Sequence, residues 1–346
     1  MKAVFLIIDY VPHQVLSIKT LIERNSAEIL AFHVGRFNIS TPKHLPDFST
    51  SLYTEKPKDQ ILSDIIHFNP DVVVTAGWMI PEYNWLCKRL KKSSTIPIVA
   101  MTDTPWYGSV KQKINVHLSL FYIKSAFTHL WVAGIRQYDY ARKLGFTNNQ
   151  IIFNSLSADT RIFHQVDIMS KVVNYPKNFL YIGRYTEVKG LRNLMNAWSS
   201  IKDKKGWTFT LIGEGEMKEE LESTENFIVK EFMTQDRLLE EMKLTGCFVL
   251  PSLKEPWALV IHEAAAAGLP IICTETCGAA PHFVINYYNG FRIQDNSIED
   301  LKDKLELIIH TDENVLLEYG KRSRKLSHTI NPEIQMASLL QLINGN

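Results

Sequence analysis

Short runs rich in valine and isoleucine alternate with amphipathic stretches along most of this sequence of 346 residues. In the first half, the strand-like runs are 3–8, 28–34, 71–75, 96–101, 129–133 and 150–153, and stretches of helical periodicity such as 15–24 and 59–68 lie between them. This alternation predicts a parallel sheet with helices on both faces. It also restricts where a ligand can bind, because sites on such sheets lie at the carboxyl ends of the strands.

A second alternation begins after residues 155–177, where the periodicity lapses and turn-forming residues gather. We expect strands at 179–183, 207–212, 227–229, 247–250, 269–273 and 290–293, and helices at 191–201, 216–222, 297–309, 313–325 and 332–343. The sequence therefore predicts an α/β protein with two Rossmann-like domains whose parallel sheets face each other across a cleft. The domains are expected at 1–160 and 161–330, and a C-terminal helix in 331–346 is expected to pack back on the first domain.

The composition is ordinary for a soluble globular protein, with 45% hydrophobic and 22% charged residues. The formal net charge is only +1, so the overall charge gives no reason to expect nucleic acid as a partner. The four cysteines are expected to be reduced and buried, and Cys273-x3-Cys277 lacks the second pair that a zinc site would need. The apolar run at 3–8 is too short for a signal peptide and runs into Asp9, so we expect a cytoplasmic protein.

Two glutamates, Glu255 and Glu263, stand eight positions apart in the second half. Pro256 suits the first position of a helix and Gly268 suits its end. A helix beginning at Pro256 would separate the two carboxylates by about 12 Å along its axis. The alanines at 264–267 predict close packing, in which a charge on Glu263 would need a hydroxyl partner. The competing interpretation is that Glu255 only caps the helix and that Glu263 lies on a solvated face.

A glycine and two cations, Gly183, Arg184 and Lys189, occupy the loop after the first strand of the second alternation. The arginine can form paired hydrogen bonds with phosphate oxygens, and the lysine adds a mobile charge. The competing interpretation is a solvated basic loop.

Small residues mark two further loops. Gly213 and Gly215 follow the next strand, where they would let a nucleotide approach the backbone. Gly278 and Ala279 follow a later strand, and we expect their N–H groups to be free to bind an anion. The competing interpretation is that both loops are simply tight turns that bind no ligand.

Taken together, these residues resemble the donor domain of the retaining family 4 glycosyltransferases, which have a GT-B fold. The resemblance extends over about residues 179–293. The matching residues are Gly183-Arg184, Lys189-Gly190, Gly213-x-Gly215, Glu255-x7-Glu263, Gly268-Leu269-Pro270 and Asn289-Gly290.

The resemblance implies a role for each of these positions. Arg184 and Lys189 would neutralise a diphosphate, Glu263 would bind the ribose hydroxyls, and Glu255 would contact the donor sugar. The backbone near Phe232 and Met233 would frame the base. The implied donor-binding set is Gly183, Arg184, Lys189, Gly213, Gly215, Phe232, Met233, Glu255, Ala258, Leu259, Glu263, Gly278 and Ala279. The catalytic candidates are Glu255, Arg184, Lys189 and, from a loop of the first domain, Asp103.

The activity implied is transfer of a hexosyl unit, with retention, from a UDP- or GDP-sugar to a hydroxyl of a saccharide or lipid-linked glycan. The first domain would bind the acceptor, and polysaccharide or glycolipid biosynthesis is the setting that the resemblance suggests. We expect no metal and no cofactor, because cations of the chain would stabilise the leaving diphosphate and no Asp-x-Asp occurs. The sequence departs from the family at His282, where a glutamate is typical, and at residues 9–13, which lack the usual glycine pair.

Other interpretations stay open. A catalytically silent nucleotide-sugar-binding protein, or a nucleotide-sugar hydrolase or epimerase, would share the donor domain. The basic segments 88–92 and 111–124 could rest on anionic lipid at the inner face of the plasma membrane, or they could be a solvated helix end and a core helix. A nicotinamide dehydrogenase is disfavoured because residues 9–13 lack Gly-x-Gly-x-x-Gly.

Overall fold

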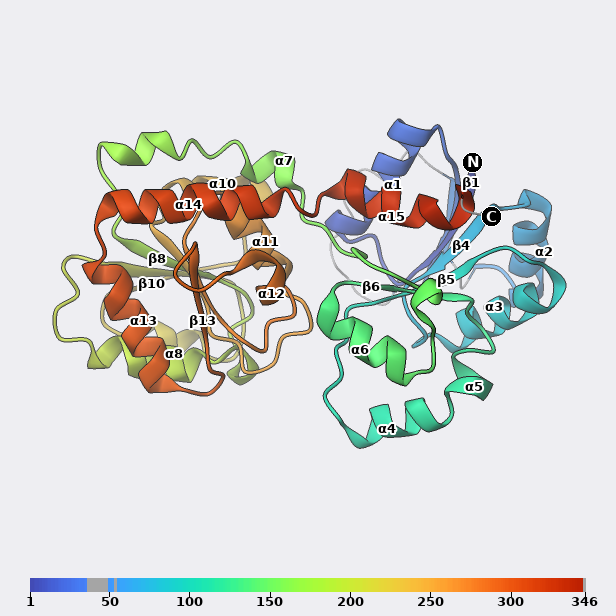
Figure 1. Cartoon of the computed structure of the whole chain (residues 1–346), viewed down its shortest axis with the longest axis horizontal. Helices are drawn as coiled ribbons and strands as arrows, with labels where there is room; N and C mark the ends of the chain where they lie inside the picture. The colour runs from blue at the N-terminus through green and yellow to red at the C-terminus, as the bar shows by residue number, and fades with distance from the viewer. Residues whose placement is uncertain (36–48, 53–54, 345–346) are drawn as a thin grey trace. The chain divides into compact units, whose positions relative to one another are not determined.

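The computed structural model describes residues 1–35, 49–52 and 55–344 (Figure 1). The chain forms two compact units, each described by itself below. Unit 1 comprises residues 1–157 together with the C-terminal segment from Pro332, and unit 2 comprises Ala158–Asn331. The sequence had placed these divisions after residues 160 and 330. Residues 345 and 346 of the expected C-terminal segment lie outside the described part.

Unit 1 is built on a seven-stranded sheet with the order β3-β2-β1-β4-β5-β6-β7, in which neighbouring strands pair in parallel. The prediction named six of these strands and missed β3, whose sequence Ser-Thr-Ser-Leu lacks the valine and isoleucine of the others. The strands are β1 (Lys2–Ile7), β2 (Glu28–His33), β3 (Ser49–Leu52), β4 (Val72–Thr75), β5 (Ile98–Thr102), β6 (His129–Val132) and β7 (Ile151–Ile152).

Helices connect these strands and cover both faces of the sheet (Figure 1). Proline occupies the beginning of three of them, at Pro12, Pro81 and Pro332, where a missing N–H costs little. The helices are α1 (Pro12–Asn25), α2 (Lys58–Phe68), α3 (Pro81–Ser93), α4 (Val110–His117), α5 (Ser119–Tyr122), α6 (Ile135–Lys143), the short η2 (Asn148–Gln150) and α15 (Pro332–Asn344).

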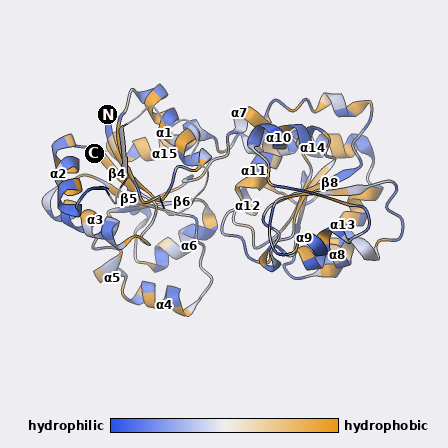
Figure 2. Cartoon of the chain, turned by 180° about the vertical axis from the view of Figure 1, so that it is seen from behind, coloured by the Kyte–Doolittle hydropathy of each residue, from blue (hydrophilic) through white to orange (hydrophobic). Residues whose placement is uncertain are grey.

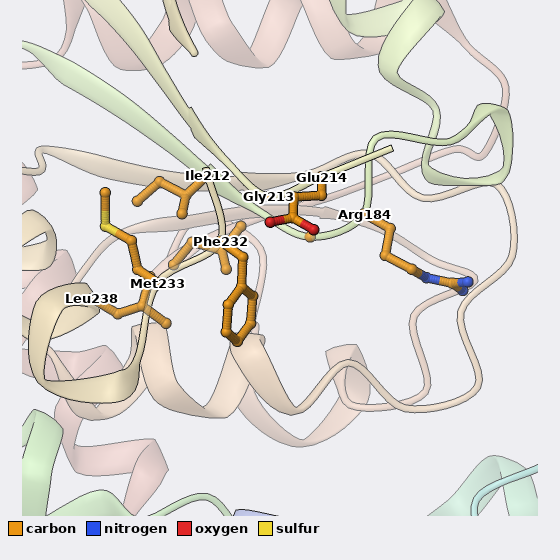
Figure 3. Close-up of a pocket in the computed structure, with 9 residues that line it drawn as sticks. Arg184, Ile212, Gly213, Glu214, Phe232, Met233 and Leu238 are labelled. Atoms are coloured by element: carbon orange, nitrogen blue, oxygen red, sulfur yellow. The ribbon is translucent and has the colours of Figure 1, made fainter. Parts of the chain in front are cut away.

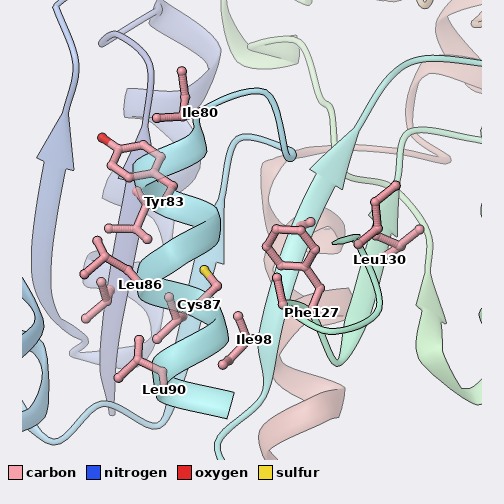
Figure 4. Packing of buried hydrophobic residues seen from close by; sticks show 14 of the residues in the cluster. Ile80, Tyr83, Leu86, Cys87, Leu90, Ile98, Phe127 and Leu130 are labelled. Carbon is pink, nitrogen blue, oxygen red and sulfur yellow. The ribbon is translucent and has the colours of Figure 1, made fainter. Parts of the chain in front are cut away.

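Each face of the sheet has its own apolar core. On one face, α3 turns Tyr83, Leu86 and Leu90 toward the sheet, and these side chains are almost fully buried (Figure 4). The Tyr83 hydroxyl donates to the carbonyl of Ile7 at 2.9 Å, so this buried polar group is satisfied. The Cys87 thiol is also buried, as predicted for all four cysteines.

The C-terminal helix α15 lies beside α1 and supplies Met336 and Leu339 to the core on the other face (Figure 1). Its Gln335 is buried and accepts a hydrogen bond from the Ser17 hydroxyl at 2.8 Å. The Gln335 amide also donates to the carbonyl of Ser155 at 2.6 Å. The helix is therefore an integral part of unit 1 even though unit 2 precedes it in the sequence.

Unit 2 contains a six-stranded parallel sheet with the order β10-β9-β8-β11-β12-β13. All six predicted strands are present. They are β8 (Asn178–Ile182), β9 (Thr208–Ile212), β10 (Phe227–Lys230), β11 (Cys247–Leu250), β12 (Ile271–Thr274) and β13 (Gly290–Ile293).

The helices of unit 2 surround this sheet and include α10, which the sequence prediction missed. They are α7 (Thr160–Phe163), η3 (Met169–Val172), η4 (Glu187–Lys189), α8 (Leu191–Ser200), α9 (Lys218–Glu222), α10 (Gln235–Lys243), α11 (Leu259–Ala266), α12 (Ala280–Phe283), α13 (Ile298–His310) and α14 (Glu313–Ser327).

The prediction of a helix from Pro256 was wrong. Helix α11 begins at Leu259, because Ala258 has φ 75° and ψ 72°, a left-handed conformation that cannot continue into a right-handed helix. The expected axial separation of Glu255 and Glu263 therefore does not apply. Within the part of the chain that the structure describes, no helix has the length and apolar character needed to span a bilayer.

Candidate donor-binding site

Four loops of unit 2 leave the sheet at the carboxyl ends of β8, β9, β11 and β12. They contain residues 183–190, 213–217, 251–258 and 275–279. Because the strands are parallel and these four loops follow strands of one sheet, they emerge at the same edge, where open α/β sheets bind ligands.

The first two loops are joined to each other through the backbone. The Tyr185 N–H donates to the carbonyl of Glu214 at 2.7 Å. A Cβ atom on Gly213 would lie 1.9 Å from the Gly183 oxygen, and one on Gly215 would lie 2.4 Å from the Tyr185 oxygen. Both glycines are therefore required by the contact between the loops. Their expected role in admitting a nucleotide stays a prediction.

An ion pair links the loop after β8 to the loop after β11. The Lys189 ammonium contacts a carboxylate oxygen of Glu255, and the two side chains are only 14% and 12% exposed. The Ser252 hydroxyl lies 3.4 Å from the same oxygen. Two predicted site residues that are 66 positions apart in the sequence are thus in direct contact.

Arg184 differs from Lys189 in its surroundings. Its side chain is exposed, and it forms no salt bridge with any residue that the structure describes. The guanidinium at this sheet edge therefore lacks a carboxylate to neutralise it, which suits it to bind an anionic group.

Glu263 lies on α11 and is buried, so the interpretation that placed it on a solvated face was wrong. The alanines that follow it are fully buried, as the sequence predicted. Burial raises the pKa of Glu263 to about 7, while the Gln235 amide, which donates to its carboxylate at 3.3 Å, acts in the opposite direction. A buried carboxyl with a single neutral donor has capacity to accept further hydrogen bonds from a ligand.

The expected anion nest at Gly278 and Ala279 is contradicted by the backbone. The Gly278 N–H donates to the Glu255 carbonyl at 3.2 Å, and the Ala279 N–H donates to the Trp257 carbonyl at 2.8 Å. These small residues instead hold the strand-like segment 255–257 in place. Among the described residues, the N–H groups of Leu259 and Val260 at the start of α11 have no hydrogen-bond acceptor, as is usual for a first helical turn.

A pocket of about 280 Å³ lies beside these loops (Figure 3). Phe232, Met233 and Leu238 form one side, and the Arg184 side chain extends away from them at the other end (Figure 3). Ile182, Gly183, Ile212, Gly213 and Glu214 complete the lining. The Phe232 ring is 71% exposed, which is unusual for so large an apolar side chain and leaves a flat surface available for stacking.

Asp103 is the one predicted site residue in unit 1. It follows β5, its side chain is exposed, and its carbonyl accepts a hydrogen bond from the Gln137 amide at 2.8 Å. Because it belongs to the other unit, its role toward the donor stays a prediction.

Sequence reasoning missed two buried polar groups on these loops. Neither the Thr186 hydroxyl oxygen nor the Trp257 indole nitrogen has a hydrogen-bond partner among the described residues. Such groups are uncommon in folded proteins and often mark a place where a ligand or water supplies the partner. The only available signal in the sequence was their position between charged residues of the loops.

His262 was also missed, since a single histidine beside Glu263 gave no motif. It is fully buried, its Nδ1 accepts from the Ala158 N–H at 3.2 Å, and its Nε2–H donates to the Ser327 carbonyl at 3.0 Å. Its ring stacks on Phe283 with centroids 4.2 Å apart. Burial lowers its pKa to about 4, so it is a neutral bridge between α11 and both ends of unit 2.

Among the described residues, no three or more histidine, cysteine, aspartate or glutamate side chains are placed together so that they could hold a metal ion.

Comparison with known proteins identifies the same part of the chain. Residues 168–326 match the family model of the glycosyl transferases group 1. An uncharacterized glycosyltransferase of Methanocaldococcus jannaschii is 32% identical over 160 residues, which are 43% of each chain. The N,N'-diacetylbacillosaminyl-diphospho-undecaprenol alpha-1,3-N-acetylgalactosaminyltransferase of Campylobacter jejuni is 25% identical over 219 residues, 59% of this chain and 57% of the relative. The chain thus spans about half the length of these curated relatives.

Solved structures resemble the whole chain. The structure of Anabaena HepE in complex with UDP has a TM-score of 0.81 and 13% identity, with all of both chains covered. Sucrose-phosphate synthase from Thermosynechococcus elongatus has a TM-score of 0.77 and 16% identity, also with full coverage of both. These similarities confirm the predicted GT-B fold class of two Rossmann-like units.

Proposed function

We propose that this protein is a retaining glycosyltransferase that moves a hexosyl unit from a nucleoside-diphosphate sugar to a hydroxyl group, without a metal ion. The observation that carries the proposal is the charge arrangement at the carboxyl edge of the unit 2 sheet. There, Lys189 pairs with Glu255 and the exposed Arg184 borders an apolar pocket, within a segment that matches the glycosyl transferases group 1. A diphosphate needs such cations, and a base needs such a pocket.

The donor is proposed to be a UDP- or GDP-sugar. The pocket would hold the base against Phe232 and Met233, and Glu263 would accept hydrogen bonds from the ribose hydroxyls. The first turn of α11 would face the phosphates, since its N–H groups at Leu259 and Val260 lack acceptors among the described residues. The complex of Anabaena HepE with UDP supports a uridine nucleotide in a protein of the same fold.

The proposed reaction breaks the bond between the anomeric carbon and the diphosphate oxygen. A bond from the acceptor oxygen to the same carbon forms on the same face of the sugar, and the acceptor proton passes to the departing phosphate. Arg184 and Lys189 stabilise the negative charge that develops on the diphosphate. Glu255 orients Lys189 through their ion pair and contacts the sugar.

The acceptor is proposed to be a saccharide or a lipid-linked glycan, bound by unit 1. The name of the Campylobacter jejuni relative gives a diphospho-undecaprenol substrate for that protein. Another relative, from Staphylococcus aureus, is a capsular polysaccharide biosynthesis glycosyltransferase, 27% identical over 195 residues. These names support surface polysaccharide or glycolipid assembly. A cytoplasmic location and peripheral contact with the membrane are further parts of the proposal.

Calorimetric titration with UDP, GDP and their sugars in the presence of EDTA tests the donor site. We expect one diphosphate to bind to the native protein, and Arg184→Ala to weaken that binding by about tenfold or more, because a charge-assisted phosphate contact is lost. Lys202→Ala, which removes an exposed cation after α8, should bind as the native protein does. Failure of every diphosphate to bind would refute the donor site.

Product analysis distinguishes the proposal from its alternatives. A transferase consumes the sugar nucleotide only slowly until a glycan acceptor is added. Rapid release of free sugar in water would indicate a hydrolase, and diphosphate binding without turnover on any acceptor would indicate a silent binding protein.

A further inference from the structure

The surface formed by α4, Leu118 and α5 in unit 1 carries an unusual concentration of exposed apolar side chains. Phe121 is 77% exposed and Val110 is 73% exposed, and Ile114, Leu118 and Leu120 are also exposed. Figure 2 shows hydrophobic and hydrophilic residues mixed along these two short helices. Positions 110, 114, 118 and 121 recur every three or four residues, so their side chains share one face.

Two uncharged polar residues of the same segment, Gln112 and Ser119, point inward. The buried Gln112 amide donates to the Pro105 carbonyl at 2.7 Å, and its oxygen accepts from the Tyr107 N–H at 2.8 Å. The buried Ser119 hydroxyl donates to the Leu144 carbonyl at 2.6 Å. This is the reverse of the arrangement on a helix at a water-exposed surface, where apolar residues face the core. The outward apolar face is thus fixed by specific hydrogen bonds on the inward face.

Positive charge is concentrated in the part of the sequence that contains this face. Residues 83–138 contain eight lysines and arginines and only one acidic residue, Asp103, in a chain whose net charge is only +1. Lys111 and Lys113 are exposed on α4 itself. The Lys88 ammonium lies at the edge of the face, where it donates to the Phe121 carbonyl at 3.1 Å.

We propose that the α4–α5 surface docks on an anionic lipid bilayer, with Val110, Ile114, Leu118, Leu120 and Phe121 inserted among the acyl chains. The surrounding lysines then contact the headgroups. A bilayer with anionic lipid offers both an apolar layer and a negatively charged layer at the depth that one short amphipathic segment reaches. The charge complementarity favours this partner over a neutral protein surface. The inference requires no bound donor, so it can fail while the donor site stands.

Docking at this surface would act directly on unit 1's proposed acceptor loop. Gln112 joins α4 to the loop 103–108, which follows β5 and carries Asp103. That loop lies at the carboxyl end of the sheet, where ligands of this fold bind. Immobilising α4 on a membrane would therefore hold the acceptor loop near the headgroups, where a lipid-linked hydroxyl is found.

Vesicle sedimentation of the full chain provides the test, using phosphatidylcholine vesicles with and without phosphatidylglycerol. We expect the protein to sediment with the anionic vesicles and to stay in solution with phosphatidylcholine alone, and added salt should weaken the binding. The double variant Leu120→Ser and Phe121→Ser should bind about tenfold or more weakly, because two inserted side chains are lost. Lys111→Gln with Lys113→Gln should bind about tenfold or more weakly at low salt.

Matched controls come from unit 2. Leu244 is 66% exposed, as Leu120 is, so Leu244→Ser should sediment as the native protein does. Lys202→Gln with Lys325→Gln removes two exposed lysines and should also leave binding unchanged.

Two outcomes of the sedimentation assay would overturn the proposal: no binding of the native protein to anionic vesicles, or equally strong binding by the α4–α5 variants. So would light scattering that shows a dimer in the native protein and a monomer in Leu120→Ser with Phe121→Ser, because the face would then bind a second copy.

Discussion

His262→Gln is expected to remove a specific pH dependence from the stability of unit 2. His262 is fully buried and neutral, accepting from the Ala158 N–H and donating to the Ser327 carbonyl. Protonation would place a hydrogen on Nδ1 facing the Ala158 N–H, which breaks one hydrogen bond and leaves a buried charge. The other titratable groups that act on it, His164 and His282, lower its pKa further when charged.

The magnitude follows from the shift of its pKa from 6.5 to about 4. Between these values the unfolded chain binds a proton that the folded protein does not, so stability falls as the pH falls through this range. A shift of about 2.5 units corresponds to about 3 kcal/mol lost between roughly pH 6.5 and pH 4. Above pH 6.5 the neutral histidine imposes no such cost.

Urea unfolding followed by circular dichroism at a series of pH values measures the effect. Glutamine keeps a donor and an acceptor but does not titrate, so His262→Gln should be about 1–2 kcal/mol less stable near pH 8, from imperfect hydrogen bonds and packing. As the pH falls, this difference from the native protein should shrink and then reverse before pH 4.5, because the native protein loses more stability than the substitution costs. His310→Gln, at an exposed position, is the control and should follow the native curve. A native slope that persists unchanged in His262→Gln would refute the reasoning.

Two further predictions concern the donor site. Gly213→Ala should destabilise unit 2 by about 2–4 kcal/mol in urea unfolding, since its Cβ would lie 1.9 Å from the Gly183 oxygen and the two loops would have to separate; a change within about 0.5 kcal/mol would show that the loop contact is not needed. Diphosphate affinity should rise up to about tenfold from pH 6 to pH 8 as Glu263, with its pKa raised to about 7, becomes a carboxylate that accepts the ribose hydroxyls. Titration calorimetry of Glu263→Gln should show no such rise, and an equal rise in the variant would assign the pH dependence to another group.

Local patterns in the sequence were enough for much of the fold. Runs such as Val72–Thr75 and Cys247–Leu250 are short, apolar and continuous, and they are found as buried parallel strands. The strand that the prediction missed, β3, has an edge position and a polar sequence, so it carries no periodic signal.

For helix α11, the local pattern instead predicted a start that was too early. Pro256 favoured an early start, but the left-handed backbone at Ala258 delayed it until Leu259.

The motifs predicted which loops would lie at one sheet edge, but not how their groups would be used. The close approach of Gly213 to Gly183 depends on two loops that are about 30 positions apart in the sequence. The N–H groups of Gly278 and Ala279, expected to be free, are engaged by segment 255–257. Hydrogen-bond partners of this kind are set by the meeting of distant segments and leave no local pattern.

The sequence alone determined that this protein has two parallel sheets and that cations, glycines and paired glutamates follow their strands. Helix and strand periodicity is a property of neighbouring residues, so it can be read directly from the chain. Only the tertiary structure decided that Lys189 meets Glu255, that His262 bridges both ends of unit 2, and that α4 turns its apolar face outward. These features depend on distances between residues far apart in the sequence, and packing of the complete fold sets those distances.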